Sequence, residues 1–261
     1  MPVGRSLHVG INQVGPAFPN AGILTGPEND AQSMRDLAHA RGFVTELIQG
    51  SSATSATVVA SLLRAASISQ PGDIFMFTFA GHGTGVFDPT SEEDDNQDEA
   101  LLLFDALLFD DQLSAQIWPA FSNGVRVLMV ADSCHSGTVA AKIAAGEIKD
   151  RTRLRQISAE TSAAHLTAYR AFYRQLAIPV FSTIGASVLL LAACEDLETT
   201  PDGDPHGAFT AALLQVVQDG QPKDYRDLIS KIRQLVGPQV PQLTPLEPAD
   251  EKFIDQVPFT I

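Results

Sequence analysis

Three short and almost wholly apolar segments set the strongest constraint on how this chain folds. They run from Ile74 to Ala80, from Val125 to Ala131 and from Val188 to Ala193. A strand without polar alternation is covered on both faces, as happens in a parallel sheet with helices on either side. Further strands are predicted at Leu7–Ile11 and Phe43–Ile48, and helices at Asn29–Ala40, from the cap Thr54 to about Ser69, Phe209–Val217 and Asp224–Leu235. This alternation predicts an α/β fold with right-handed crossovers.

Composition and charge exclude several classes of function. The 261 residues carry 17 Lys and Arg against 31 Asp and Glu, a formal net charge of −14, which argues against a nucleic-acid partner. Met1 to Gly10 lacks the apolar core of a secretion signal, and the run from Ile184 to Cys194 is about half a membrane span. Two cysteines make no disulfide framework. We therefore expect a cytoplasmic protein with no membrane partner.

The candidate chemistry follows two of the buried strands. His82 lies just beyond Ala80, and Cys134 just beyond the second apolar run, so both are expected at the carboxyl edge of the sheet. A cysteine attacks as a thiolate, and a neighbouring imidazole can take its proton. The N–H groups of Gly83 and Cys134 are candidates for holding a developing oxyanion. The alternative is a buried structural cysteine beside an incidental loop histidine.

These two motifs carry a resemblance to a known family. Gly81-His82-Gly83 and the six residues from Asp132 to Gly137 resemble the caspase–haemoglobinase clan of cysteine peptidases, and within it the metacaspases and their prokaryotic relatives, the orthocaspases. The resemblance runs from Leu7 to Phe209, with support from the segments 26–31 and 207–210. It implies a three-layer caspase-like fold, a cysteine endopeptidase, a His82 and Cys134 dyad, and a monomer.

The resemblance also implies an organisation for the chain. We expect one caspase-like peptidase domain over 1–261, with a large-subunit-like part to about 140, a basic insertion over about 141–184, and a small-subunit-like part over 185–261. His135 and Cys194 are interpreted as structural, because the first should point away from the nucleophile and the second has no Gly-His element nearby.

The predicted specificity comes from two carboxylates. Asp132 precedes Cys134 by two positions, so in extended backbone both side chains leave the same face. The resemblance adds Asp30 at the same edge, and a bound cation would relieve the repulsion between the two carboxylates. Metacaspases use these positions to hold Arg or Lys, so we expect cleavage after Arg or Lys and not after Asp. The alternative is that Asp30 is a helix-start charge and Asp132 a turn former.

No cofactor is expected to be required, although the resemblance raises calcium. Many metacaspases need it, and Asp98, Asp110 and Asp111 match three of the ligand carboxylates, whereas Ala141 replaces a fourth. The segment Ser91–Glu99 is interpreted as a solvated acidic loop. Calcium therefore stays an open alternative.

The basic insertion permits three interpretations. The stretch from Thr138 to Ile184 holds seven of the 17 basic residues. An enzyme that prefers Arg or Lys could cut itself near Lys149–Arg155, or an uncut arginine could occupy the acidic pocket and restrain activity. A solvated helical face is the third interpretation.

Other functions fit less well. Val86 stands where a dinucleotide-binding loop needs its third glycine, the serine-hydrolase elbow is missing around Ser133 and Ser136, and the His and Cys residues lack zinc-ligand spacing. The main alternative to a peptidase is a catalytically silent caspase-like scaffold or interaction module.

Overall fold

The computed structural model describes most of the chain. It covers residues 1–87, 97–133, 155, 157, 159–168, 183–193, 202–236, 240–246 and 250–261, with the main chain alone at 86–87, 97–98 and 159–160. Cys134, His135, Ala141 and Cys194 lie outside these residues. No helix in the described part of the chain has the length and apolar character that crossing a bilayer requires.

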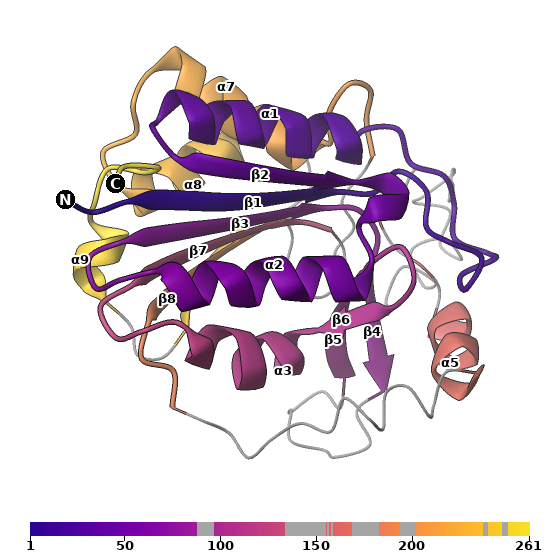
Figure 1. Cartoon of the computed structure of the whole chain (residues 1–261). Coiled ribbons are helices and arrows are strands. Elements are labelled where there is room, and N and C mark those ends of the chain that lie inside the picture. Colours follow the sequence, from indigo (N-terminus) through magenta and orange to yellow (C-terminus); the bar gives the residue numbers. More distant parts are fainter. Residues whose placement is uncertain are drawn as a thin grey trace.

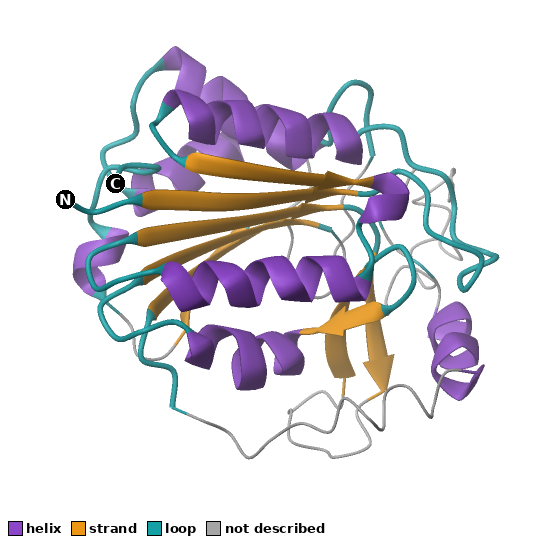
Figure 2. Cartoon of the chain, viewed as in Figure 1, coloured by secondary structure: helices purple, strands orange, loops and turns teal. Residues whose placement is uncertain are grey.

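A six-stranded sheet forms the middle layer of the molecule (Figures 1 and 2). Its order is β2-β1-β3-β7-β8-β9, in which the first five strands are parallel and β9 is antiparallel to β8. The strands are β1 (Gly4–Gly10), β2 (Val44–Gln49), β3 (Ile74–Ala80), β7 (Arg126–Asp132), β8 (Ser187–Ala192) and β9 (Gln242–Leu246). Each of the three apolar runs is therefore a strand inside the sheet, flanked by strands on both sides.

Helices cover both faces of the sheet, which confirms the predicted three-layer α/β fold (Figure 2). On one face lie α1 (Pro27–Ala40), α7 (Ala208–Asp219) and α8 (Tyr225–Leu235), and on the other lie α2 (Ser55–Ile68) and α3 (Asp110–Gln112), which continues as short π and 3₁₀ turns to Ala120. Alternate residues of β3 feed the two cores: Phe75 packs on the α2 side and Met76 on the α1 side. Burial on both faces explains why this strand shows no polar alternation.

Two helix starts carry capping side chains, of which Thr54 was predicted and Asp224 was not. Thr54 caps α2, with its side chain accepting a hydrogen bond from the N–H of Thr57, and Asp224 caps α8 through the N–H of Asp227. Such caps satisfy N–H groups that a helix cannot satisfy internally. A 3₁₀ turn (Gly50–Ser52) precedes α2, and α9 (Glu251–Ile254) lies near the C-terminus.

A second, three-stranded antiparallel sheet was not predicted. It consists of β4 (Gly83–Phe87), β5 (Gln97–Leu102) and β6 (Leu107–Phe109), beyond the carboxyl end of β3 (Figure 1). The prediction of an acidic loop over Ser91–Glu99 is wrong at its end, because residues 97–99 pair with β4. The pairing of β4 with β5 places Gly83, the glycine after His82, at the first position of a strand.

Candidate active site

His82 lies buried just beyond the end of β3. Its Nε2 atom is 2.7 Å from the carbonyl oxygen of Gly22, in the loop between β1 and α1. Because a carbonyl oxygen only accepts, Nε2 carries the hydrogen and Nδ1 keeps its lone pair. Nδ1 is buried and has no hydrogen-bond partner among the described residues. Burial lowers the pKa of His82 below its ordinary value, against the effect of the Gly22 hydrogen bond, so the imidazole is neutral near pH 7.

The register between β3 and β7 relates His82 to the cysteine motif. Ala80 pairs with Asp132, and the N–H of Gly81 lies 3.4 Å from the Asp132 carbonyl oxygen. His82 and Cys134 each come two positions after a member of this pair, on adjacent parallel strands. The described chain stops at Ser133, one residue before Cys134, so the dyad itself stays a prediction.

Three carboxylates surround the guanidinium of Arg155. Its Nη1 lies 2.9 Å from Oδ2 of Asp132, and its Nη2 lies 3.2 Å from Oδ1 of Asp202 and also pairs with Oδ2 of Asp30. Nη1 further donates to the Asp132 carbonyl oxygen at 3.2 Å. The Arg155 side chain has 0% exposure, and Asp30 and Asp132 have 1% and 2%. For Arg155, the interpretation of a solvated helical face is therefore wrong.

Each carboxylate is held from a second element. Asp132, at the end of β7, accepts from the N–H and hydroxyl of Thr210 in α7, at 3.2 and 2.6 Å. Asp30, in the first turn of α1, lies 2.9 Å from Nδ1 of His206 and accepts from the N–H of Gly207 at 3.3 Å. The pocket is thus built where the starts of α1 and α7 meet the end of β7.

Electrostatics follow from this burial. Burial raises the pKa of Asp30 to about 6, although the charge of Arg155 opposes the rise. The carboxylates of Asp132 and Asp30 outweigh the burial of Arg155 and raise its pKa, so the guanidinium stays charged. Hydrogen bonds from Thr25 and the charge of Arg155 lower the pKa of Asp202, although burial acts in the opposite direction. The pocket is therefore anionic near pH 7 and matched to a cation.

Two glycines form the walls of the pocket. A Cβ atom on Gly207 would stand 2.6 Å from Cζ of Arg155, and one on Gly26 would stand 2.7 Å from its Nη2. Real Cβ atoms essentially never come so close, so any side chain at either position would displace the guanidinium. Both glycines belong to segments that supported the family resemblance, but their role as walls was not predicted.

Gly83 presents its backbone to the same segment. Its N–H donates to the carbonyl oxygen of Arg155 at 2.9 Å. This is the N–H group that the sequence indicated for holding an oxyanion, and here it faces a peptide carbonyl.

Other features were not predicted or are not tested. Asp202 was not predicted, because it lies in a loop without a motif, and neither was the contact of Gly22 with His82. Asp110 and Asp111 lie at the start of α3, and the side chain of Asp98 lies outside the described residues. The described residues contain no group of three His, Cys, Asp or Glu that could hold a metal ion, and the proposed calcium set stays untested.

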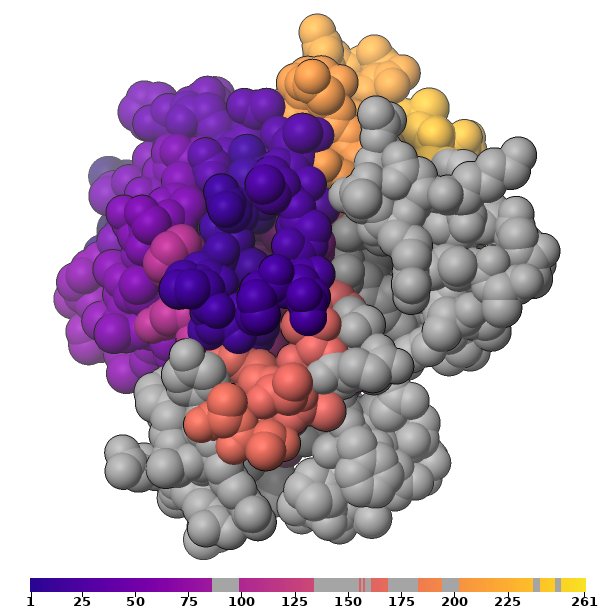
Figure 3. All heavy atoms as spheres, turned by 90° about the vertical axis from the view of Figure 1, so that its right-hand side faces the viewer, coloured from indigo at the N-terminus to yellow at the C-terminus, as the bar shows by residue number. Residues whose placement is uncertain are grey.

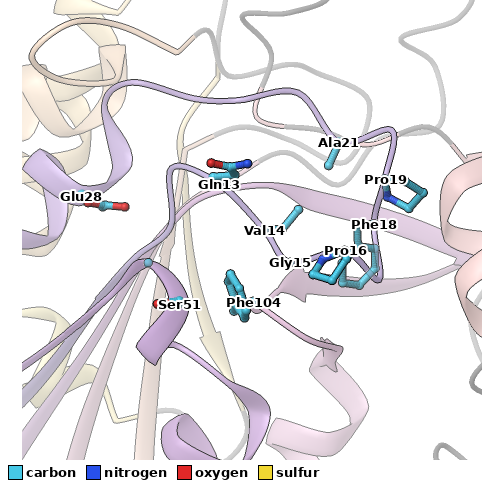
Figure 4. Close-up of a pocket in the computed structure, with 11 residues that line it drawn as sticks. Gln13, Val14, Gly15, Pro16, Phe18, Pro19, Ala21, Glu28, Ser51 and Phe104 are labelled. Atoms are coloured by element: carbon cyan, nitrogen blue, oxygen red, sulfur yellow. The ribbon is translucent and has the colours of Figure 1, made fainter.

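A hollow of about 560 Å³ lies at the loop between β1 and α1 (Figure 4). Val14, Phe18 and Phe104 line it with apolar surface, and Glu28 and Gln13 add polar groups. None of the residues around the Arg155 side chain lines this hollow.

A buried neutral histidine lies beside an anionic pocket at the carboxyl edge of an α/β sheet. This is the arrangement expected of a caspase-like cysteine peptidase. The comparison with family models agrees, because the caspase domain model matches residues 7–252. The chain belongs to the caspase-domain family of cysteine endopeptidases.

The curated proteins that match this chain include metacaspases. It is 24% identical to metacaspase-1 of Mycosarcoma maydis over 94% of this chain and 71% of the relative. It is 28% identical to metacaspase-2 of Arabidopsis thaliana over 64% of this chain, which spans 39% of that protein. These relatives support a metacaspase-like member of the clan.

Solved structures show the same fold. The crystal structure of a Geobacter sulfurreducens protein matches with a TM-score of 0.88 and 35% identity, over 100% of this chain and 99% of the other. Caspase-1 of Spodoptera frugiperda matches with a TM-score of 0.58 and 13% identity, over 93% and 86%. The second likeness shows the caspase-like fold alone.

Proposed function

We propose that this protein cleaves peptide bonds after Arg or Lys, with Cys134 as nucleophile and His82 as general base. The observation that carries the proposal is the buried pocket of Asp30, Asp132 and Asp202, which encloses a guanidinium. In keeping with the metacaspase resemblance, we expect a monomer. A thiol nucleophile must stay reduced, so we place the activity in a reducing compartment such as the cytoplasm.

The roles of the residues follow from their protonation. Nδ1 of His82 has a free lone pair and takes the proton of the Cys134 thiol as the thiolate attacks the peptide carbonyl. The N–H of Gly83 stabilises the oxyanion that forms. The imidazolium then protonates the leaving amine, and water hydrolyses the acyl-enzyme with His82 as base. The hydrogen bond to Gly22 keeps the ring oriented throughout.

The geometry of the pocket favours arginine over lysine. Two guanidinium nitrogens contact three carboxylates and one carbonyl oxygen, an arrangement that suits a planar fork of donors. A lysine ammonium is a point charge and cannot reach opposite sides of the pocket in this way. An aspartate would add a fourth negative charge in a buried site and is excluded by repulsion.

Three fluorogenic peptides that differ only in Arg, Lys or Asp before the reporter group test the proposal. We expect hydrolysis in the order Arg, then Lys, with no measurable cleavage after Asp, and no hydrolysis by Cys134→Ala. The assay is run once with calcium and once with a chelator, which decides the calcium question separately. Preference for Asp would refute the proposed specificity, and no hydrolysis of any peptide would indicate a silent scaffold.

A further inference from the structure

Asp202 reaches the anionic pocket from the loop before α7. Its Oδ1 atom lies 3.2 Å from Nη2 of Arg155, and its side chain is only 4% exposed. Unlike Asp30 and Asp132, it belongs to no recognisable motif. Figure 3 shows the orange residues after position 200 against the N-terminal part of the chain, in indigo and purple, with α5 (Ala159–Ala168), in salmon, on the other side. The third carboxylate of the pocket is therefore supplied by a separate segment of the chain.

The segment before α1 holds Asp202 with three hydrogen bonds. The N–H of Thr25 donates to Oδ2 at 2.7 Å, the Thr25 hydroxyl donates to the same oxygen at 2.9 Å, and the N–H of Gly26 donates to Oδ1 at 3.1 Å. Although burial acts to raise it, the pKa of Asp202 is lowered by the hydrogen bonds from Thr25 and by the charge of Arg155. Asp202 is therefore a charged carboxylate near pH 7, with both oxygens held in place.

Two glycines allow this close approach. A Cβ atom on Gly26 would stand 2.6 Å from the carbonyl oxygen of Gly203 and 3.0 Å from Oδ1 of Asp202. A Cβ atom on Gly203 would stand 2.2 Å from the carbonyl oxygen of His206. Neither position has room for a side chain, so the main chains on both sides fix where Asp202 stands.

The three carboxylates divide the guanidinium of Arg155 between them. Asp132 pairs with Nη1, whereas Asp30 and Asp202 both pair with Nη2. Each terminal nitrogen of a guanidinium carries two hydrogens, so Nη2 can serve both of its carboxylates. The contact with Asp202, at 3.2 Å, is the longest of the three ion pairs.

A lysine side chain reaches less far into this pocket. Along the side chain, its Nζ atom corresponds to Cζ of arginine, which is one bond short of Nη2. Asp202 cannot follow the shorter side chain, because Thr25 and Gly26 hold it. The longest contact is lost first, so an ammonium that pairs with Asp30 and Asp132 leaves Asp202 without a cation.

We propose that Asp202 is the residue that makes this pocket prefer arginine to lysine, and that Thr25 is the positioning residue that holds it. This inference rests on the proposed function, because it assigns the discrimination between two substrates of the same site. The contact is made at the end of the substrate side chain as soon as the substrate binds. It should therefore act on KM and leave kcat unchanged.

Asp202→Asn removes the charge and keeps the shape of the side chain. With two peptides that differ only in Arg or Lys before the reporter group, we expect the Arg-to-Lys ratio of kcat/KM to fall about tenfold, through KM, as for the loss of one hydrogen bond to a charged group. Both peptides meet the same enzyme, so the occupancy of the pocket by Arg155 cancels in the ratio. Asp204→Asn, at an exposed position of the same loop, is the control and should keep the wild-type ratio.

Variants of Thr25 test the positioning role. Thr25→Val keeps the N–H and the shape but removes the hydroxyl that donates to Asp202, and the ratio should fall about threefold. Thr25→Ser keeps the hydroxyl and should keep the wild-type ratio. A merely structural role would lower kcat/KM for both peptides alike and leave the ratio unchanged. If Asp202→Asn does not fold, as judged by circular dichroism, these two variants decide.

The outcomes separate this inference from the proposed function. An enzyme that cleaves after Arg and Lys but keeps its ratio in Asp202→Asn, or changes it equally in Asp204→Asn, would overturn the inference alone. A wild-type enzyme that hydrolyses neither peptide would overturn both.

Discussion

Asp132 and Arg155 form a buried ion pair, with 2.9 Å between Oδ2 and Nη1, at the end of the strand that leads to Cys134. The same carboxylate accepts two hydrogen bonds from Thr210, so α7 fixes its position. The anionic pocket and the last described residues before Cys134 therefore lie at one strand end. Substitutions in the pocket should therefore lower the activity, while the strands of the sheet keep their pairing.

Asp132→Asn keeps the shape of the pocket and removes one charge. We expect kcat/KM for the Arg peptide to fall about 100-fold, because a buried cation that loses one partner costs roughly 3 kcal/mol or more. Steady-state kinetics on the purified enzyme measure this. Asp36→Asn, an exposed position on α1, is the control and should leave kcat/KM unchanged. An equal loss in both variants would contradict the assignment.

Gly207→Ala should close the pocket without unfolding the protein. Gly207 has a φ of −62°, which alanine adopts readily, and its Cβ would clash with the guanidinium at 2.6 Å. We expect loss of Arg-peptide hydrolysis and a lower melting temperature, because Arg155 is displaced from its buried ion pairs, while the circular dichroism spectrum at 25 °C stays that of the folded protein. Gly185→Ala is the matched control, because its Cβ would meet its nearest neighbour at an ordinary 3.4 Å. Full activity of Gly207→Ala would show that substrate arginine binds elsewhere.

The pocket should lose affinity in mild acid. Burial raises the pKa of Asp30 to about 6, so this carboxylate is protonated below that pH and no longer attracts a cation. KM for the Arg peptide should rise as pH falls below about 6, and Asp30→Asn should flatten this dependence. Burial lowers the pKa of His82, so the acid limb of kcat should lie below the ordinary histidine value of 6.5. A KM that stays constant down to pH 5 would contradict the role of Asp30.

Lowering the pH should reduce the folding stability through His8, whereas it should raise the stability through Asp30. His8 is buried in β1 between Ser6 and Thr78, and burial lowers its pKa to about 3. Between pH 6.5 and 3 the unfolded chain binds a proton at His8 that the folded chain does not, so stability falls by about 1.4 kcal/mol per pH unit. Over the same range, the raised pKa of Asp30 adds stability below about pH 6.

Urea unfolding at pH 7 and pH 5 isolates the His8 effect. From pH 7 to pH 5, the free energy of unfolding should fall by roughly 2 kcal/mol less in His8→Gln than in wild type. His39→Gln, at an exposed position of α1, should keep the wild-type dependence. Identical curves for wild type and His8→Gln would show that His8 does not titrate as its burial requires.

The buried strands were predictable, and the smaller sheet was not. Phe75 and Met76 face opposite cores, so their strand is apolar on both faces and stands out in the sequence. The strand β4 begins with glycine and β5 begins with polar residues, so neither shows a buried pattern. Strand β9 contains Pro245, which is compatible with its position at the edge of the sheet but hides it from a search for strand formers.

Within the site, the residues in motifs were predictable and their partners were not. Asp30 and Asp132 lie next to recognisable segments, whereas Asp202 enters the pocket from a loop whose position depends on the whole fold. Arg155 is one of seven basic residues in the insertion, and a single sequence gives no sign of which one is buried. A charged side chain is buried only where tertiary structure supplies its partners, and those partners here come from positions 30, 132 and 202.

The most direct test of the central claim is covalent labelling with a peptidyl chloromethyl ketone that carries arginine at the reactive end. The enzyme should gain one adduct, located by peptide mapping on Cys134, and excess Arg peptide should protect it. The reagent with aspartate in place of arginine should not react. An adduct on Cys194, or equal labelling by both reagents, would contradict the assignment of Cys134 as an arginine-directed nucleophile.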